Sequence, residues 1–160
     1  MPHTVTAQED EAAAQSNPYI KTSGLPVPRF ISLASNKVFM RTGPGLRYPI
    51  RWVYKQKNMP IEVIQEFDTW RKVRDVDGQE GWVHQSLLSG RRTAYIQEEK
   101  GAILLRKAKT DAQPLAILEN RVLVTLEECE KDWCRARVDN FKGWIEKKSL
   151  WGVYGQEELD

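Results

Sequence analysis

The sequence lacks several features that would assign it to a common functional class. Its longest apolar runs are only a few residues, such as Ala102–Leu105, whereas a membrane-spanning helix needs about 20 predominantly apolar residues. It has only two histidines, His3 and His84, and neither lies at zinc-ligand spacing from the two cysteines. It also has no glycine-rich phosphate loop, paired-carboxylate motif or Gly-x-Ser-x-Gly elbow. We therefore expect no membrane span, metal site or cofactor, and no enzymatic activity.

A strong charge of one sign is also missing. The 160 residues include 24 basic and 22 acidic side chains, for a net charge of +2. A nucleic-acid-binding domain would carry a strong basic excess on one face, so we expect no nucleic-acid partner. Hydrophobic residues make up 41% and charged residues 29% of the chain, which is ordinary for a soluble globular protein.

An internal repeat organises the chain, because two windows, 31–90 and 94–153, align with each other. The matched segments are Val38–Arg41 with Ile103–Arg106, Trp70–Arg71 with Trp133–Cys134, and Gly81–Val83 with Gly143–Ile145. The offset between them drifts from 65 to 62 residues, as expected if loops change length while strands do not. The chain is therefore predicted to hold two copies of one small domain.

Each copy has the pattern of β-structure. Pro60–Phe67 alternates apolar and polar residues over part of its length, which is typical of a half-buried strand, and Val122–Leu126 is β-branched and apolar at the matching place. Asp77-Gly78 lies between two such runs and predicts a tight hairpin; Asp139-Asn140 is its counterpart. We therefore predict an all-β fold.

The small size of each copy predicts how the two copies are stabilised. A unit of about 60 residues buries only ~60% of its unfolded surface, so each copy alone would be marginal. We expect the copies to pack against each other across the short junction Arg91–Thr93 as a fixed pair. We also expect aromatic cores built from the six tryptophans, Trp52, Trp70, Trp82, Trp133, Trp144 and Trp151.

Three segments of the first copy carry a resemblance to a known family: Val38–Gly45, with its Arg-Thr-Gly-Pro turn, Trp70–Val73 and Gly81–His84. In this order they resemble the bacterial SH3-like (SH3b-type) domain family. The second copy has Lys107–Thr110 in place of the Gly-Pro turn and is the divergent member. The resemblance implies two tandem SH3-like β-barrels. We divide the chain into a disordered or extended leader (1–29), barrel 1 (30–90), barrel 2 (91–153) and an acidic tail (154–160) expected to fray.

The two cysteines, Cys129 and Cys134, align with Glu66 and Arg71 of the first copy. Those positions flank a hairpin loop, where opposite charges would face each other across two strands. Opposed hairpin residues lie close enough for a disulfide, which is favoured if the protein is exported. Two free thiols are the alternative, and a redox-active pair is a weaker one because no Cys-x-x-Cys motif is present.

The candidate ligand surface lies in the first copy, where aromatic and basic residues interleave. Stacking faces combined with cations suit contacts with peptides, glycans or anionic polymers. The alternative is that the aromatic residues pack the core and the charges are merely solvated. The candidate residues are Arg41, Arg47, Tyr48, Arg51, Trp52 and Tyr54.

These observations lead to a functional hypothesis. Residues 1–8 contain no charged and apolar signal segment, but Val5-Thr6-Ala7 before Gln8 has the small-residue spacing of a signal-peptidase site. With the family resemblance, this favours the periplasm or cell surface over the cytoplasm. We predict a non-enzymatic binding module of the cell envelope that recognises cell-wall polymer or an envelope protein through barrel 1. The alternative is a scaffold or dimerisation protein with barrel 2 as its docking surface; the oligomeric state stays open.

Overall fold

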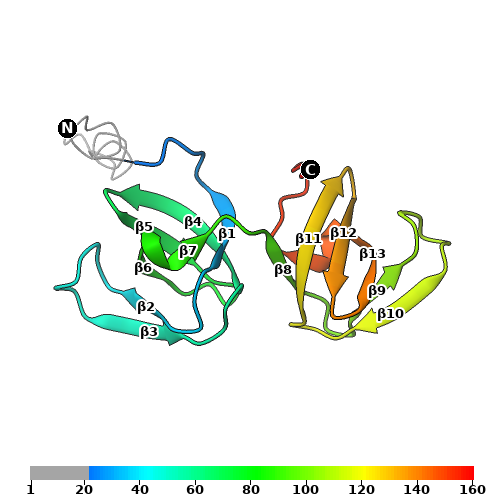
Figure 1. Ribbon diagram of the computed structural model, residues 1–160, viewed down its shortest axis with the longest axis horizontal. Helices are drawn as coiled ribbons and strands as arrows, with labels where there is room; N and C mark the ends of the chain where they lie inside the picture. Colours follow the sequence, from blue (N-terminus) through cyan, green and yellow to red (C-terminus); the bar gives the residue numbers. More distant parts are fainter. Residues whose placement is uncertain (1–21) are drawn as a thin grey trace, which may run out of the picture.

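The computed structural model describes residues 22–160, which form two seven-stranded antiparallel sheets placed side by side (Figure 1). The first repeat has the strand order β3-β2-β6-β5-β4-β1-β7, and the second repeats it as β10-β9-β13-β12-β11-β8-β14. The strands of the first repeat are β1 (Arg29–Leu33), β2 (Val38–Arg41), β3 (Ile50–Tyr54), β4 (Pro60–Phe67), β5 (Trp70–Arg74), β6 (Glu80–His84) and β7 (Leu88–Ser89). Those of the second are β8 (Thr93–Ile96), β9 (Ala102–Leu105), β10 (Pro114–Leu118), β11 (Leu123–Glu130), β12 (Trp133–Val138), β13 (Phe141–Glu146) and β14 (Leu150–Trp151).

The predicted all-β fold and its internal repeat are confirmed. The alternating segment Pro60–Phe67 is β4, and Asp77-Gly78 lies in the turn between β5 and β6. Gly78 has φ of 85° there, a backbone conformation that glycine adopts without steric cost. A one-turn 3₁₀ helix follows the sixth strand of each repeat: η1 (Gln85–Leu87) in the first and η2 (Lys147–Ser149) in the second.

The cores are mainly aliphatic, and the expectation that the six tryptophans would fill them is wrong for all but Trp70. The fully buried side chains of the first repeat include Leu33, Met40 and Val73. Trp70 is 9% exposed, whereas 47% of Trp52 is exposed. The other four tryptophans are half-buried. Because neighbouring residues of a strand point to opposite faces, a tryptophan next to an inward-facing residue lies outside the core.

The two Gly-Trp-apolar segments illustrate this alternation. A Cβ atom on Gly81 would lie 2.5 Å from Cγ of Met40 and 2.9 Å from the backbone oxygen of Arg41. Gly81 therefore faces inward at a close crossing with β2, and Val83 is buried on the same side. Trp82 between them points outward. The motif thus fixes how closely two strands approach, and its tryptophan covers the outer face.

The expected packing between the two repeats is present. The Tyr95 ring, on β8 of the second repeat, joins the core cluster of the first. The Thr93 hydroxyl donates to the backbone oxygen of Asn58 at 2.6 Å, and the Tyr154 hydroxyl donates to Glu62 at 2.5 Å. Burial and the hydrogen bond to Glu62 raise the pKa of the Tyr154 hydroxyl. Residues of β8 and Tyr154, which follows the second sheet, thus tie the two repeats together.

Both ends of the described chain contact the barrels. Ser23, from the leader, contacts Glu66 on β4, and β1 begins at Arg29. The tail does not fray as expected: Leu159 and Cys129 exchange two backbone hydrogen bonds at 2.9 and 2.7 Å, and Figure 1 shows this end beside β11. The sequence from 1 to 21, including Val5-Thr6-Ala7, lies outside the described residues. No helix in the described part of the chain is long and apolar enough to cross a bilayer.

Candidate functional site

The first repeat has an open groove between the loop that joins β2 to β3 and the end of β6. Its volume is about 600 Å³. The lining is mainly apolar and comes from three separate segments of the chain. We call it the Trp70 groove, and its lining residues are Leu46, Thr69, Trp70, His84, Ser86 and Leu87.

Trp70 and His84 are directly opposite each other on β5 and β6, and their rings meet edge to face with centroids 5.2 Å apart. The backbone N–H of Ser86 donates to Nδ1 of His84 at 3.2 Å. Because that N–H can only donate, Nδ1 is an acceptor and the neutral ring carries its proton on Nε2. The groove therefore combines an indole surface with a histidine whose tautomer is set by the start of η1.

The other wall of the groove is a loop held in shape by its own residues. The Nη1 atom of Arg41 donates to the backbone oxygens of Leu46 and Tyr48 at 3.2 and 3.0 Å. The Tyr48 ring lies so close to Gly43 that a Cβ there would approach within 2.5 Å of it, which explains the glycine in the Gly-Pro turn. The loop presents Leu46 with 77% of its surface exposed. This is a preformed apolar contact point.

The six residues predicted as a ligand surface fall into three groups. Arg41, the last residue of β2, holds the loop in shape. Arg47 and Tyr48 belong to the loop, and the Arg47 guanidinium lies 5.1 Å from the Tyr48 ring centroid. Arg51 and Trp52 lie exposed on the edge strand β3.

Tyr54 is a correction to the prediction, because it is buried in the core. It lies opposite Val38 on β2, and its hydroxyl donates to Asp75 at 2.7 Å. Burial and this hydrogen bond raise the pKa of the Tyr54 hydroxyl. Tyr54 therefore stabilises the barrel and is not available to a ligand.

Leu46 and Leu87 are not among the ligand residues predicted from the sequence, and Trp70 is predicted there as a core residue. The repeat held one usable signal: Trp70 and Trp133 occupy the same place at the start of the fifth strand in each copy. The second repeat indeed has a groove of about 610 Å³ beside Trp133. Its lining is more charged and includes Asp132, Glu146 and Lys148, with Lys148 and Glu146 paired at 3.1 Å.

The predicted equivalence of the cysteines with Glu66 and Arg71 is confirmed by strand register. Glu66 pairs with Arg71 on β4 and β5, and Cys129 pairs with Cys134 on β11 and β12. In the structure the two cysteines form a disulfide with Cα atoms 4.0 Å apart. The two repeats thus link the same two strand positions, one by an ion pair and one by a covalent bond.

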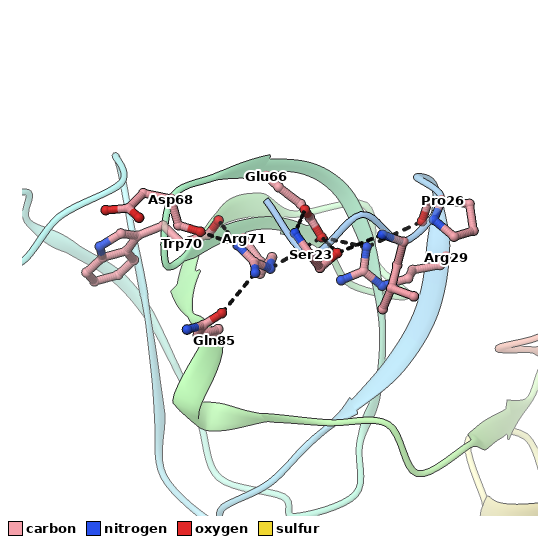
Figure 2. A network of polar contacts seen from close by, with 9 residues as sticks. Ser23, Pro26, Arg29, Glu66, Asp68, Trp70, Arg71 and Gln85 are labelled. Carbon is pink, nitrogen blue, oxygen red and sulfur yellow. Dashed lines mark hydrogen bonds and ion pairs between the residues drawn. The ribbon is translucent and has the colours of Figure 1, made fainter. Parts of the chain in front are cut away.

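The ion pair belongs to a larger polar network, shown in Figure 2. Nε of Arg71 lies 3.4 Å from Oε1 of Glu66, and Nη1 of Arg29 lies 2.7 Å from the same oxygen. Ser23 donates to Glu66 from its backbone at 2.8 Å and from its hydroxyl at 2.5 Å. Burial of the Glu66 carboxylate raises its pKa, but these contacts outweigh burial and hold the pKa below its usual value.

A metal site is not indicated within residues 22–160. No group of three or more histidine, cysteine, aspartate or glutamate side chains there is arranged to hold a metal ion.

Two small antiparallel sheets that repeat one strand order in tandem place the chain in the class of small SH3-like β-barrel modules. A family model described as "Bacterial SH3 domain" matches residues 34–90 and 98–152. The chain therefore belongs to the bacterial SH3 domain family, in two tandem copies.

Several solved structures are similar to the chain over most of its length. NlpC2 and NlpC1 from Trichomonas vaginalis are each 12% identical, with TM-scores of 0.37 and 0.36, and both alignments cover 81% of this chain. An NlpC/P60 endopeptidase from Photobacterium damselae subsp. piscicida is 14% identical, with a TM-score of 0.35 and 95% of this chain covered. The alignments cover 50%, 47% and 39% of those chains, so this chain spans half or less of each. No curated protein matches the sequence.

Proposed function

We propose that this protein is a non-enzymatic binding module of the bacterial cell envelope, and that its first repeat recognises cell-wall material in the Trp70 groove. The observation that carries the proposal is a preformed, mainly apolar groove on a member of the bacterial SH3 family. Pockets that combine apolar walls with a few fixed polar groups are typical binding sites. Here the fixed polar groups are His84 and Ser86.

The lining favours a peptide over a bare glycan as the part of the wall that enters the groove. Leu46 and Leu87 offer aliphatic contacts, and Trp70 lines the same groove with its ring against His84. An extended peptide could place small side chains against these surfaces while its backbone bonds to the histidine. In the groove of the second repeat, by contrast, carboxylates and ammonium groups would lose hydration when covered. We therefore place wall recognition in the first repeat.

We place the protein in the periplasm or at the cell surface. The Cys129–Cys134 disulfide supports this location, because disulfides persist in oxidising compartments and are rare in the cytoplasm. Alkylation of the protein from intact cells, with and without prior reduction, tests the location. Cysteines that are blocked only after reduction are expected, and thiols that react directly would argue for the cytoplasmic alternative.

Co-sedimentation with purified, insoluble peptidoglycan tests the proposed function. Leu46→Asp places a charge at the groove entrance without disturbing the core, since Leu46 is 77% exposed. Full burial of a leucine contributes about 1.5–3 kcal/mol, so the affinity measured from retention should fall roughly tenfold or more. Phe141→Asp is the matched control, because Phe141 is 49% exposed in the second repeat and does not line the groove. Equal retention of the wild type and Leu46→Asp would refute binding in this groove.

The face predicted from the sequence is tested in the same assay. Arg47→Ala and Trp52→Ala alter the loop and the edge strand without touching the residues that line the groove. We expect both variants to bind within about twofold of the wild type. If only these two variants lost binding to peptidoglycan, the ligand would bind at the exposed loop and strand β3 and not in the groove.

A second function, as a scaffold or dimerisation protein, is favoured by one observation. Ile103 and Ile117 are directly opposite each other on β9 and the edge strand β10, and both are more than half exposed. Paired apolar residues at a sheet edge suit a protein contact. A concentration-dependent dimer in sedimentation velocity, abolished by Ile117→Lys, would support this function, and a monomer at all concentrations would exclude it.

A further inference from the structure

The second repeat binds a carboxylate of its own chain. Arg92 donates to both carboxylate oxygens of Glu157, at 2.5 and 2.9 Å. Nζ of Lys147 donates to the backbone oxygens of Gly155 and Glu157 at 3.2 and 2.5 Å, and the Tyr154 backbone N–H donates to Glu157 at 3.1 Å. A bidentate arginine and a buried lysine thus hold an acidic segment against the barrel.

The first repeat has residues at the two positions that hold this segment. Arg29, the first residue of β1, lies opposite Val63 on β4, as Arg92 lies beside Leu126 on β11, so Arg29 corresponds to Arg92. Gln85, at the start of η1, corresponds to Lys147, at the start of η2. Matched backbone hydrogen bonds establish the second correspondence, namely Gln85 N–H to Thr69 at 2.8 Å and Lys147 N–H to Asp132 at 2.9 Å. Arg92 and Lys147, which hold the tail on the second repeat, therefore have counterparts in the first repeat.

An open pocket lies at this place in the first repeat. Its volume is about 210 Å³, enough for one acidic side chain. After Gly90 the chain leaves for the second repeat, whereas after Gly152 it turns back as the tail. We call this space the arginine pocket, and its lining includes Leu25, Arg29, Arg71, Gln85, Ser89 and Gly90.

The charges around the arginine pocket favour an anion. Arg29 and Arg71 both pair with a single carboxylate, that of Glu66, so the described groups carry one excess positive charge. Figure 2 shows Arg71 reaching from Glu66 toward Gln85, which accepts from its Nη2 at 2.9 Å. Arginine binds carboxylates well because its planar group offers several donors in a fixed geometry.

We propose that the arginine pocket binds a carboxylate of an acidic peptide segment from a partner protein, in the way that the second repeat binds Glu157. The proposal does not rest on wall binding by the Trp70 groove, which is lined by different residues. The tail itself supplies a probe of known chemistry: a synthetic peptide with the sequence of residues 152–160. Replacement of its Glu157 by glutamine gives the matched neutral peptide.

Two variants of the full chain change the pocket at one residue. Gln85→Lys introduces the residue that the second repeat has at this position and should bind the acidic peptide more tightly. Gln85→Glu keeps an acceptor for Arg71 but adds a negative charge, and it should bind more weakly. A single charge about 4 Å from the ligand is worth about 1 kcal/mol even in water, so each change should alter the affinity roughly fivefold, in opposite directions.

The measurement is a titration of the ¹⁵N-labelled protein with each peptide, followed by amide chemical shifts. We expect saturable changes in the amide chemical shifts of Arg29, Gln85 and Gly90, with weaker binding of the neutral peptide. The acidic peptide should bind Gln85→Lys more tightly, and Gln85→Glu more weakly, than the wild type. Three results would overturn the proposal: no shifts at millimolar peptide, shifts confined to Arg92 and Lys147, or equal affinity of both variants. Thermal unfolding of each variant checks that the fold is intact.

Discussion

Removal of the Glu66 carboxylate is the perturbation for which the structure gives the firmest magnitude. The Glu66 side chain is 5% exposed and lies between two guanidinium groups. Removing one partner of a buried charge pair costs about 3–5 kcal/mol, because the other charge stays buried without compensation. Arg29 and Arg71 keep backbone acceptors at Pro26 and Asp68, which reduces the loss. We therefore expect Glu66→Ala to lower the free energy of unfolding by about 3 kcal/mol.

Differential scanning calorimetry of the full chain measures this loss. For a domain of 60–100 residues, 1 kcal/mol corresponds to about 4–8 °C in Tm, so the unfolding transition of the first repeat should fall by at least about 10 °C. Glu128→Ala is the matched control. Glu128 lies 3.4 Å from Arg135, but both side chains are more than a third exposed, and such pairs contribute about 0–1 kcal/mol. Equal losses for the two variants would refute the assigned role of the Glu66 network.

Glu66→Ala should also change how the free energy of unfolding depends on pH. Contacts with Ser23, Arg29 and Arg71 more than offset the effect of burial and lower the pKa of Glu66 in the folded protein. Because the pKa of Glu66 is lower in the folded than in the unfolded protein, ionised Glu66 stabilises the fold at pH values above its unfolded-state pKa, about 4.3. This stabilisation is lost as the pH falls below that value toward the folded-state pKa. Between pH 6 and pH 3 the wild type should therefore lose more stability than Glu66→Ala. A constant difference between the two proteins would contradict this cause.

Three further predictions concern the close packing and links of the two repeats. Gly81→Ala should cost about 1–3 kcal/mol in urea unfolding, because its Cβ would lie 2.5 Å from Cγ of Met40; an unchanged midpoint would argue against the tight crossing. Tyr154→Phe removes the hydrogen bond to Glu62 and should lower the free energy of unfolding by about 1.5–3 kcal/mol. Because this bond joins the two repeats, their calorimetric transitions should also separate. Reduction of the disulfide, which links residues only 5 apart, should cost no more than about 2 kcal/mol, and full unfolding on reduction would contradict a local role.

The repeat and its consequences could be predicted from the sequence because they depend on strand register. The alignment matched Cys129 and Cys134 with Glu66 and Arg71. In the structure each pair lies across the corresponding hairpin of its own repeat. Alternation along a strand also explains the main error about the cores. Gly81 faces inward, so its neighbour Trp82 lies outside the core, and hydrophobicity alone does not reveal this.

The groove and the ends of the chain depend on contacts that local patterns do not encode. Leu46 and His84 line one groove but belong to a loop and a strand far apart in the sequence. On the edge strand β3, Trp52 and Tyr54 lie opposite Met40 and Val38 on the same face of the sheet, yet Trp52 is 47% exposed and Tyr54 only 5%. The tail is held by Arg92, 65 residues before Glu157, so its acidic composition alone suggested fraying.

The most direct test of wall recognition follows the six tryptophan indole N–H signals during titration with soluble peptidoglycan fragments. Trp70→Phe and Trp52→Phe assign the two relevant signals. Binding in the Trp70 groove predicts a saturable shift of the Trp70 signal, with the Trp52 signal unchanged, and loss of that shift in Leu46→Asp. A shift of Trp52 alone, or no shift of either signal at saturating fragment concentration, would contradict it.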